Sequence, residues 1–527
     1  MAMMSEMAHF RGLKPVFVVA MVLLLSACAL PGARDDTNAQ PFAEPAAAEV
    51  ISVGFDNIAD KYIEPVTLAR VGLEGLRGLG VIDAGLTLKQ DNGMLVMLEN
   101  DVEIARMRPP VDTDSRAWAA AVVALTETAR AHSADIHAAS AERIYEAIFD
   151  GALSDLDIFS RYAGQEEATR NRAKRDGFGG IGIRFRLEEG IAVITKVIVG
   201  TPAANSGLAI GDRIIRVDEM DISGLVSAEI TNLIRGPVHT PLRLTIDRPD
   251  AVQPFTIEVA RAHIVPESVT AKVEDGIGII RISTFNQDTG ETLERKLRSL
   301  TAPGARPIIG LVIDLRGNPG GLLRQSIKVA DLLLTQGEIL RTVGRHPDSL
   351  HHYEAAGSDL AVGLPIVVMI DGRSASAAEI VAAALQDRDR AVVIGTSSYG
   401  KGSVQTVIRL PNDGEITLTW SKFVTPSGYY LHGMGVVPTV CTSGKQRLED
   451  ADQIIEAALG DSQPLGTVNW RQRAYLKDEA RARLRGNCPS ERRPGRLDLK
   501  IAKRLILNDR LHVRALRLTT TTAEATH

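Results

Sequence analysis

The sequence has few aromatic residues: phenylalanine, tryptophan and tyrosine together make up 4% of its 527 residues. The hydrophobic cores of its domains, about three or four for this length, must therefore be mainly aliphatic. The formal net charge is only −5, which gives no support to nucleic-acid binding as the main role. Three cysteines are present, and no metal-ligand spacing involves them.

The apolar run near the N-terminus, residues 15–25, has the length of a secretory signal and is too short to span a bilayer stably. It ends in residues 25–28, LSAC, which resemble the bacterial lipobox, where the cysteine is lipidated and becomes the first mature residue. We therefore expect a lipoprotein signal peptide over 1–27, a lipid on Cys28 and a flexible tether over 28–45. The alternative is a plain signal peptide with an incidental cysteine.

The export signal predicts a protein of the bacterial cell envelope, on the periplasmic side and lipid-anchored to a membrane, without deciding between inner and outer membrane. Cys441 and Cys488 are then the remaining cysteines. An even count in an oxidising compartment favours a disulfide between them, and the alternative is two unpaired buried thiols.

Residues 46–176 are expected to form a mainly helical N-terminal region. Apolar residues recur at helical spacing over 51–62, and the segments 117–131 and 141–153 indicate two further helices. Residues 86–106 alternate in hydrophobicity around an Asp-Asn-Gly turn, which indicates a pair of strands.

The composition changes at residue 177, where the chain becomes rich in glycine. Residues 177–262 resemble a PDZ domain in the permuted arrangement of bacterial proteases, a small β-barrel-like domain. Its consecutive glycines would let backbone N–H groups converge on a terminal carboxylate, and the adjoining strand edge would accept an extended peptide. The predicted peptide-binding loop consists of Gly179, Gly180, Ile181 and Gly182. The alternative is that these glycines only form a tight bulge.

Strand-like and helical segments alternate over residues 263–445, which predicts an α/β core. Residues 446–527 are expected to be a basic helical extension. Its arginines and lysines could meet anionic lipid or a partner, although a charge-rich exposed helix is more often only solvated.

Residues 371–405 carry most of the chemical information. An apolar run over 365–370 ends in a small-residue turn with Ser374 and Ser376, and a glycine-flanked loop presents Lys401 after an alanine-rich helix. A serine hydroxyl is a weak nucleophile until a base takes its proton. A lysine is such a base only when neutral, so its pKa must be lowered by a poorly solvated site. The pattern is typical of a Ser-Lys hydrolase.

Several motifs together resemble the carboxyl-terminal processing, or tail-specific, peptidases over residues 46–460. The resemblance implies a multidomain α/β serine endopeptidase with a crotonase-like protease core, an inserted PDZ domain and no metal or organic cofactor. The motifs, in chain order, are GALSDLDIFSRY (151–162), DLRGNPGG (314–321), SASAAEI (374–380), GKGSVQ (400–405) and TPSGYYLHGMGVVP (425–438).

The resemblance assigns three catalytic residues: Ser376 as nucleophile, Lys401 as general base and Gln405 as the residue that orients the lysine. Lys401 follows Ser376 by 25 residues and Gln405 follows Lys401 by four, as in the family. If the chain after Gly402 is extended, Lys401 and Gln405 share one face.

The resemblance also implies an oxyanion hole of backbone N–H groups, from Ala377 and from one of Gly320 and Gly321. A Pro-Gly-Gly turn after a strand lets the backbone approach a substrate carbonyl closely. The chain departs from the family at Ala378, where a serine is usual, and at His239, where a glycine is usual.

Each assignment has a structural alternative. Ser376 and Glu379 form an S-x-x-E pattern, so this serine could merely begin a helix. Ser374 competes as nucleophile at the same turn, and Lys401 could be a surface lysine in a loop. His432 could serve a Ser-His triad, but no aspartate-histidine pairing is legible.

The sequence thus predicts a lipid-anchored periplasmic endopeptidase that binds exposed C-terminal tails of proteins in its PDZ groove. The expected partners are such substrates and a membrane, but not nucleic acid, and an adaptor protein or a homo-oligomer is left open. The competing interpretations are a non-enzymatic PDZ scaffold and a crotonase-like enzyme acting on small thioesters. The complete set of Ser376, Lys401 and Gln405 disfavours the scaffold, and the PDZ domain and the export signal disfavour the thioester enzyme.

Overall fold

The computed structural model describes residues 42–520, except 303, 305, 358, 461–475 and 493–494. The expected signal peptide, Cys28 and most of the expected tether lie outside the described residues. Among the described helices, none combines the length and the apolar character that crossing a membrane requires.

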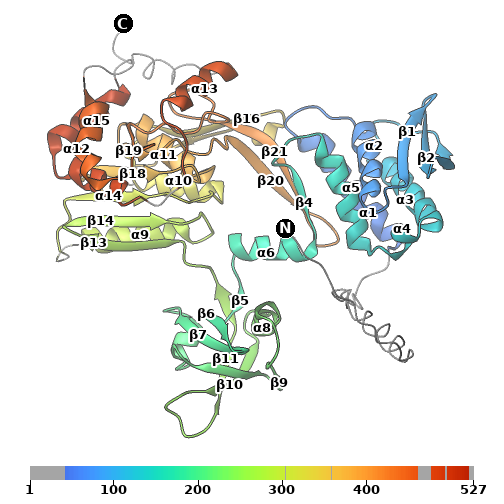
Figure 1. Ribbon diagram of the computed structural model, residues 1–527, viewed down its shortest axis with the longest axis horizontal. Coiled ribbons are helices and arrows are strands. Elements are labelled where there is room, and N and C mark those ends of the chain that lie inside the picture. Colours follow the sequence, from blue (N-terminus) through green and yellow to red (C-terminus); the bar gives the residue numbers. More distant parts are fainter. Residues whose placement is uncertain are drawn as a thin grey trace, which may run out of the picture. The chain divides into compact units, whose positions relative to one another are not determined.

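The protease part is built around a six-stranded sheet (Figure 1). The first strand is antiparallel to its neighbour and the other five are parallel. The three central strands are completely buried, as in parallel sheets that helices cover on both faces. The strand order is β13 (Val269–Glu274), β14 (Ile277–Ile282), β15 (Gly310–Asp314), β18 (Ile366–Ile370), β19 (Ala391–Gly395) and β22 (Val440–Cys441).

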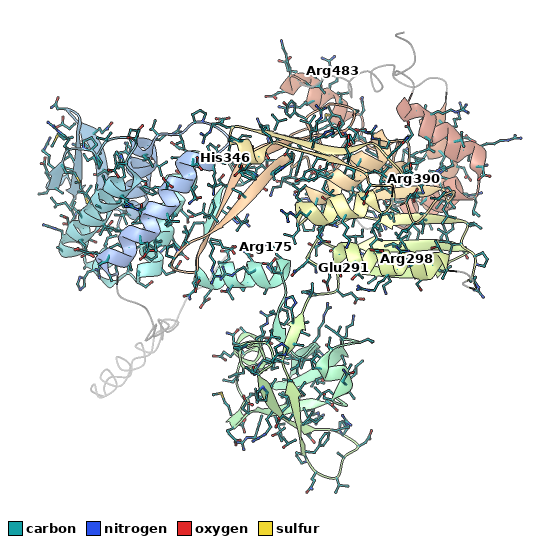
Figure 2. The ribbon with its side chains drawn as sticks, turned by 180° about the vertical axis from the view of Figure 1, so that it is seen from behind. Arg175, Glu291, Arg298, His346, Arg390 and Arg483 are labelled. Atoms are coloured by element: carbon teal, nitrogen blue, oxygen red, sulfur yellow. A yellow bond between two sulfur atoms is a disulfide. The ribbon has the colours of Figure 1, made fainter. Side chains whose placement is uncertain are left out.

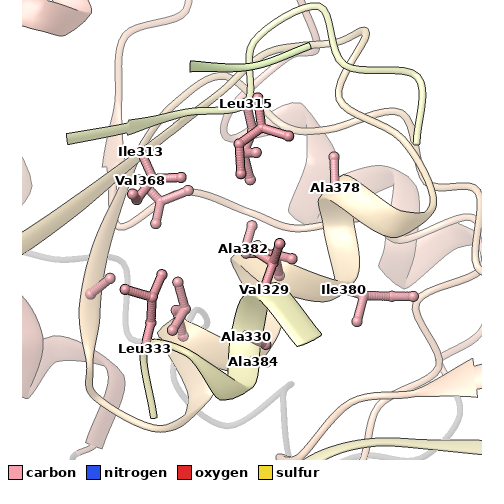
Figure 3. Close-up of a cluster of buried hydrophobic side chains, with 14 of the residues drawn as sticks. Ile313, Leu315, Val329, Ala330, Leu333, Val368, Ala378, Ile380, Ala382 and Ala384 are labelled. Atoms are coloured by element: carbon pink, nitrogen blue, oxygen red, sulfur yellow. The ribbon is translucent and has the colours of Figure 1, made fainter. Parts of the chain in front are cut away.

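One face of this sheet packs against an aliphatic layer of helices. Figure 3 shows part of this core, where Ile313 and Val368 from the strands lie near Val329 and Ala382 from the helices. Because side chains alternate along a strand, Val312 points to the opposite face. The helices of the first face are α9 (Thr289–Thr301), α10 (Leu323–Asp331) and α11 (Ala377–Asp387).

The opposite face is covered by the C-terminal segment, from which the sequence led us to expect exposed basic helices. The segment is helical, but its apolar residues instead pack against β15 and β18. Leu497, Ile501 and Leu505 recur every four residues and are buried. Lysines and arginines between these positions make the apolar stripe difficult to recognise in the sequence. The helices that contribute to this core are α12 (Ala451–Leu459), α14 (Arg496–Ile506) and α15 (Asp509–Thr520).

A second sheet joins the protease core to the N-terminal region. Its order is β17 (His351–Glu354), β16 (Glu338–Gly344), β21 (Glu415–Val424) and β20 (Ser403–Arg409), and β4 (Arg161–Ala163) pairs with β21. Ile416 and Leu418 of β21 belong to the hydrophobic core of the N-terminal region, so part of that core comes from the protease part of the chain.

The N-terminal region is mainly helical. The helices expected over 117–131 and 141–153 correspond to α3 and α5, and the helix expected over 51–62 begins earlier, at Glu44. The expected strand pair is a three-stranded sheet, and a further helix follows Thr67. The elements are α1 (Glu44–Lys61), α2 (Leu68–Gly78), β1 (Leu86–Asp91), β2 (Met94–Glu99), β3 (Val102–Met107), α3 (Ser115–His132), α4 (Ala134–Ala138), α5 (Ala141–Ser154) and α6 (Gln165–Arg175).

The PDZ domain contains a six-stranded sheet and two short helices, α7 (Pro202–Asn205) and α8 (Ser227–Ile234). A separate two-stranded ribbon, β5 (Phe178–Gly180) and β12 (Ala262–Ile264), brings the chain into and out of the domain. The sheet order is β11 (Phe255–Ala260), β10 (Pro241–Asp247), β8 (Arg213–Val217), β7 (Ile191–Val197) and β6 (Ile183–Glu188), and β9 (Met220–Asp221) pairs with β8.

Candidate active site

Ser376, Lys401 and the predicted oxyanion-hole glycines lie in loops that follow β18, β19 and β15, three neighbouring parallel strands. The carboxyl ends of parallel strands meet at one edge of the sheet, where sites of α/β proteins are formed. The Pro-Gly-Gly turn follows β15, the turn with Ser376 follows β18 and the loop with Lys401 follows β19. Segments far apart in the sequence are thereby brought together.

Ser376 lies at the sharp turn between β18 and α11, with φ 54° and ψ −116°. A non-glycine residue with this backbone conformation is strained, at a cost of about 1–3 kcal/mol, and such strain is common at functional sites. Its backbone N–H donates a hydrogen bond to Glu379 Oε2 at 2.7 Å. This bond is the carboxylate part of the capping box that the sequence predicted.

Glu379 is completely buried, and its carboxylate joins the nucleophile turn to the lysine loop. Besides Ser376 N–H, it accepts hydrogen bonds from Lys401 N–H at 2.9 Å, from Gly400 N–H at 2.6 Å and from the Ser398 hydroxyl. Burial raises the pKa of Glu379, and these four hydrogen bonds oppose that effect. One carboxylate therefore fixes the backbone of both Ser376 and Lys401.

The Lys401 side chain is partly buried, and its Nζ lies 4.9 Å from the centre of the Phe159 ring. Burial and, to a lesser extent, the charge of Arg161 lower the pKa of Lys401, while Asp157 and Glu379 act in the opposite direction. A lysine with a lowered pKa is suited to act as a base. Within the described part of the chain, its ammonium group forms no hydrogen bond with Ser376 or Gln405.

Gln405 lies near the start of β20 and is oriented within the sheet. Its side-chain amide donates to Ser403 Oγ at 2.8 Å and to Thr419 Oγ1 at 3.4 Å, and among the described residues its oxygen accepts no hydrogen bond from Lys401. The ladder between β20 and β21 shifts register between Val404 and Gln405, so the simple alternation of an extended strand does not hold there. The structure thus places Gln405 in the same loop-strand unit as Lys401, without a hydrogen bond between these two described side chains.

Two backbone N–H groups have no hydrogen-bond acceptor among the described residues: that of Ala377, next to Ser376, and that of Gly321, next to the glycine that approaches Ser376. Gly320 N–H instead donates to Asn318 Oδ1 at 2.8 Å. A side chain at Gly321 is excluded, because a Cβ atom there would lie 2.1 Å from Phe285 O. Of the two glycines that the sequence offered, Gly321 is the one whose N–H is available.

The structure also describes the surroundings of Ser374 and His432, the two residues that competed for a catalytic role. Ser374 is completely buried, and its hydroxyl donates to Leu315 O at 2.8 Å and accepts from Asp371 N–H at 2.9 Å. It therefore shapes the turn and is not exposed for attack. The pKa of His432 is lowered, mainly by burial, and its ring contacts Phe159 edge-on at 6.2 Å between centroids.

The predicted peptide-binding loop spans the junction of the ribbon and the PDZ sheet. Gly179 and Gly180 belong to β5, paired with His263 and Ala262, so only Ile181 and Gly182 form the connection to β6. Gly182 has φ 88°, and a Cβ there would lie 2.2 Å from Thr201 Oγ1. Strand β6 lies at the end of the sheet order, which leaves one edge for an added strand.

Cys441 and Cys488 lie close together and are joined by a disulfide, with 5.8 Å between their Cα atoms. The bond connects β22 of the central sheet to the segment that follows α13 (Asp478–Gly486). Among the described residues, no group of histidine, cysteine, aspartate and glutamate side chains is arranged to hold a metal ion.

Sequence reasoning did not assign roles to Glu379 and Phe159 at this site. Glu379 was visible only as part of a local capping pattern, because its contact with Lys401 spans 22 residues and a strand. Phe159 lies in the segment 151–162, which the sequence marked only as a family signature. Its N–H donates to Asp157 Oδ1 at 2.6 Å, and the same oxygen accepts from Thr419 Oγ1 at 3.2 Å, which fixes this segment on β21.

The chain matches two family models: peptidase family S41 over residues 276–442 and a PDZ domain over residues 179–259. It is 38% identical over 333 residues to the carboxy-terminal-processing protease of Bartonella bacilliformis, covering 63% of this chain and 76% of the relative. It is 32% identical over 300 residues to the carboxy-terminal processing protease CtpA of Bacillus subtilis, covering 56% of this chain and 63% of the relative.

A solved structure titled as the photosystem II D1 C-terminal processing protease is 23% identical, covers 70% of this chain and 92% of its own, and has a TM-score of 0.35. The predicted family, the α/β protease core and the PDZ domain are confirmed. The chain belongs to the carboxy-terminal processing proteases of peptidase family S41 and is a serine protease with a PDZ domain.

Proposed function

We propose that this protease is a lipid-anchored endopeptidase of the periplasm that uses a Ser376–Lys401 dyad. It would bind the exposed C-terminal tail of a protein substrate in the PDZ domain and hydrolyse peptide bonds in the α/β core. The lipid on Cys28 and the periplasmic location rest on the N-terminal sequence alone.

The observation that carries the dyad is the shared hydrogen bonding of Glu379 to the backbone of Ser376 and Lys401. Neither residue of the dyad needs the other's side chain to be held in place, because one buried carboxylate fixes both loops. A serine in a strained turn and a lysine of lowered pKa, held in neighbouring loops, support activation of the hydroxyl by the amine.

In the proposed reaction, neutral Lys401 takes the hydroxyl proton of Ser376 as its oxygen attacks the substrate carbonyl. The N–H groups of Ala377 and Gly321 stabilise the oxyanion, and the helix dipole of α11 adds to that effect. The ammonium group of Lys401 then gives its proton to the leaving amine, and water hydrolyses the acyl-enzyme by the same route. In this reaction the amine of Lys401 would lie within hydrogen-bonding distance of the Ser376 hydroxyl, and Gln405 would orient the amine.

The PDZ domain supports recognition of C-terminal tails. A substrate tail would add as a strand to the edge of β6, beside α8, with its carboxylate at the loop of Ile181 and Gly182. Backbone N–H groups that converge at such a turn favour an anion.

The test is degradation of an unstructured protein with an apolar C-terminal tail by the purified full chain. Wild type is compared with Ser376→Ala and Lys401→Ala, and with Lys174→Ala as a control at an exposed lysine of α6. We expect cleavage by wild type and by the Lys174 variant only. Equal cleavage by all four proteins would place the chemistry elsewhere, and cleavage by none would contradict the proposal for this class of substrate.

A further inference from the structure

Two arginines of helix α13, in the C-terminal segment, contact the loops around the catalytic residues: Arg481 Nη1 donates to His432 O at 3.2 Å, and Arg485 makes two further hydrogen bonds. Arg485 Nη1 donates to Met434 O at 2.7 Å, and Nη2 donates to Ser398 O at 3.0 Å. Ser398 lies three residues before Lys401, and Met434 lies in the loop against which Gly400 and Gly402 pack. One side chain thus joins the lysine loop to the loop that contains Met434.

Ser398 is a junction between the lysine loop and the nucleophile turn. Its hydroxyl donates to Glu379 and accepts from Val436 N–H at 2.7 Å, and its N–H donates to Val436 O at 3.1 Å. The next residue, Tyr399, donates its N–H to Ser374 O at 3.0 Å, two residues before Ser376. The peptide group between Ser398 and Tyr399 therefore accepts from Arg485 through its carbonyl and donates to the Ser376 turn through its N–H. The same peptide group lies two residues before Lys401 in the chain.

The space around this guanidinium group is closely filled. A Cβ atom on Gly435 would lie 3.0 Å from Arg485 Nη1 and 3.1 Å from Glu379 Oε1, and a Cβ on Gly400 would lie 3.4 Å from Arg485 Nη1. Burial lowers the pKa of Arg485, and the negative charge of Glu379 opposes this effect. The guanidinium group of Arg485 and the buried carboxyl group of Glu379 thus both lie beside Gly435.

The position of Arg485 is fixed by covalent and backbone contacts further along the chain. Cys488, one turn later, forms the disulfide with Cys441, and Cys441 pairs with Gly395 at the end of β19. At Glu491, the N–H donates to Thr396 Oγ1 at 3.2 Å and the carbonyl accepts from Gly372 N–H at 2.7 Å. The segment that carries Arg485 is therefore attached to the first residues of both catalytic loops.

We propose that Arg485 is a positioning residue of the protease site, which holds the Ser398 and Met434 carbonyls so that the Lys401 loop keeps its catalytic geometry. This inference rests on the proposed roles of Ser376 and Lys401. Lysine cannot replace the arginine fully, because an ammonium group lacks the planar fork that reaches two carbonyls at once.

The test compares wild type, Arg485→Met and Arg485→Lys in cleavage of an unstructured protein with an apolar C-terminal tail. Arg483→Met is the matched control, because Arg483 is an exposed arginine on the same helix (Figure 2). A misplacement of about 1 Å costs up to about 100-fold in rate, so we expect kcat to fall by about 10- to 100-fold in Arg485→Met. KM should change less than about two-fold, because the substitution does not alter contacts that bind the substrate and the transition state equally. Arg485→Lys should be intermediate, and Arg483→Met should equal wild type.

Thermal unfolding of each variant separates positioning from folding. An unchanged kcat in Arg485→Met would overturn the inference, and so would a kcat that falls only in proportion to the folded fraction. If Arg485→Met does not fold, the kcat of folded Arg485→Lys decides. Ser376→Ala, assayed in parallel, separates a failure of the proposed dyad from a failure of the proposed role of Arg485. If Ser376→Ala cleaves like wild type, the dyad is wrong. If Ser376→Ala is inactive and Arg485→Met is fully active, only the role of Arg485 is contradicted.

Discussion

Lys401 Nζ lies 4.9 Å from the centre of the Phe159 ring, so the proposed general base rests on an aromatic side chain from the N-terminal region. The ring excludes water from the amine, which favours the neutral form, and its face attracts the cation, which favours the charged form. Burial is the largest cause of the lowered pKa of Lys401. These opposing effects can be separated by substitution.

Replacing Phe159 by leucine should shift the pH dependence of cleavage to lower pH. Leucine retains the exclusion of water but removes the attraction between ring and cation, so the pKa of Lys401 should fall further below its ordinary value of 10.5. The measurement is kcat/KM against pH for Phe159→Leu and wild type. A shift to higher pH would mean that the ring acts mainly by excluding water.

The charge of Arg161 should act in the same direction as burial. Arg161 lowers the pKa of Lys401, so Arg161→Gln should raise that pKa. Because neutral lysine is the active form, the rise of kcat/KM with pH should then move to higher pH. Arg170→Gln, at an exposed arginine of α6, is the control and should leave the profile in place. Identical profiles for all three proteins would contradict the assignment of Lys401 as the base.

Replacing Glu379 by glutamine should impair both stability and activity. An amide offers one acceptor oxygen where the carboxylate offers two, so some of the four donors would lose their partner in a completely buried place. We expect the free energy of unfolding to fall by about 2–4 kcal/mol. We also expect kcat to fall by about 100-fold, since both loops would move.

Chemical denaturation and steady-state kinetics measure these two effects, with Glu456→Gln as the control. Glu456 is an exposed glutamate on α12, and its replacement should change neither quantity. A stable and fully active Glu379→Gln would show that the carboxylate does not hold the two loops.

The protease fold could be predicted from the sequence because the apolar runs of its strands and the alternation with helices are local patterns. The loops after β15, β18 and β19 were predictable for the same reason, since glycine and serine turns directly follow buried strands. The role of the C-terminal helices was not predictable in this way. Their apolar stripe of Leu497, Ile501 and Leu505 is narrow, and the charged residues between these positions gave the segment the composition of an exposed helix.

Contacts between distant segments were also beyond the sequence. Nothing local indicates that Arg485 reaches Ser398, 87 residues away, or that Phe159 lies against Lys401. The ladder between β20 and β21 shifts register between Val404 and Gln405, and a simple strand alternation does not reveal such a shift.

A free carboxylate should decide the affinity of the PDZ domain for a tail peptide. The proposed site at Ile181 and Gly182 offers backbone N–H groups, and hydrogen bonds to a charged group contribute about 1.5–3 kcal/mol. C-terminal amidation of an apolar peptide should therefore weaken binding by about 10- to 150-fold. Fluorescence anisotropy with the Ser376→Ala protein measures both peptides without cleavage. Equal affinities would place the tail elsewhere or assign its binding to side chains alone.

Breaking the disulfide between Cys441 and Cys488 should destabilise the C-terminal part of the protease core. The bond closes a loop with a sequence separation of 47, for which the chain-entropy model gives about 4 kcal/mol. Replacing both cysteines by serine should lower the free energy of unfolding by a comparable amount. Treating wild type with a reducing agent should have the same effect.

The disulfide lies three residues after Arg485, so its loss should also reduce the rate of substrate cleavage, measured at temperatures where the protein remains folded. Full activity of the folded double-serine protein would mean that the hydrogen bonds of Arg485 hold α13 in place without the covalent bond.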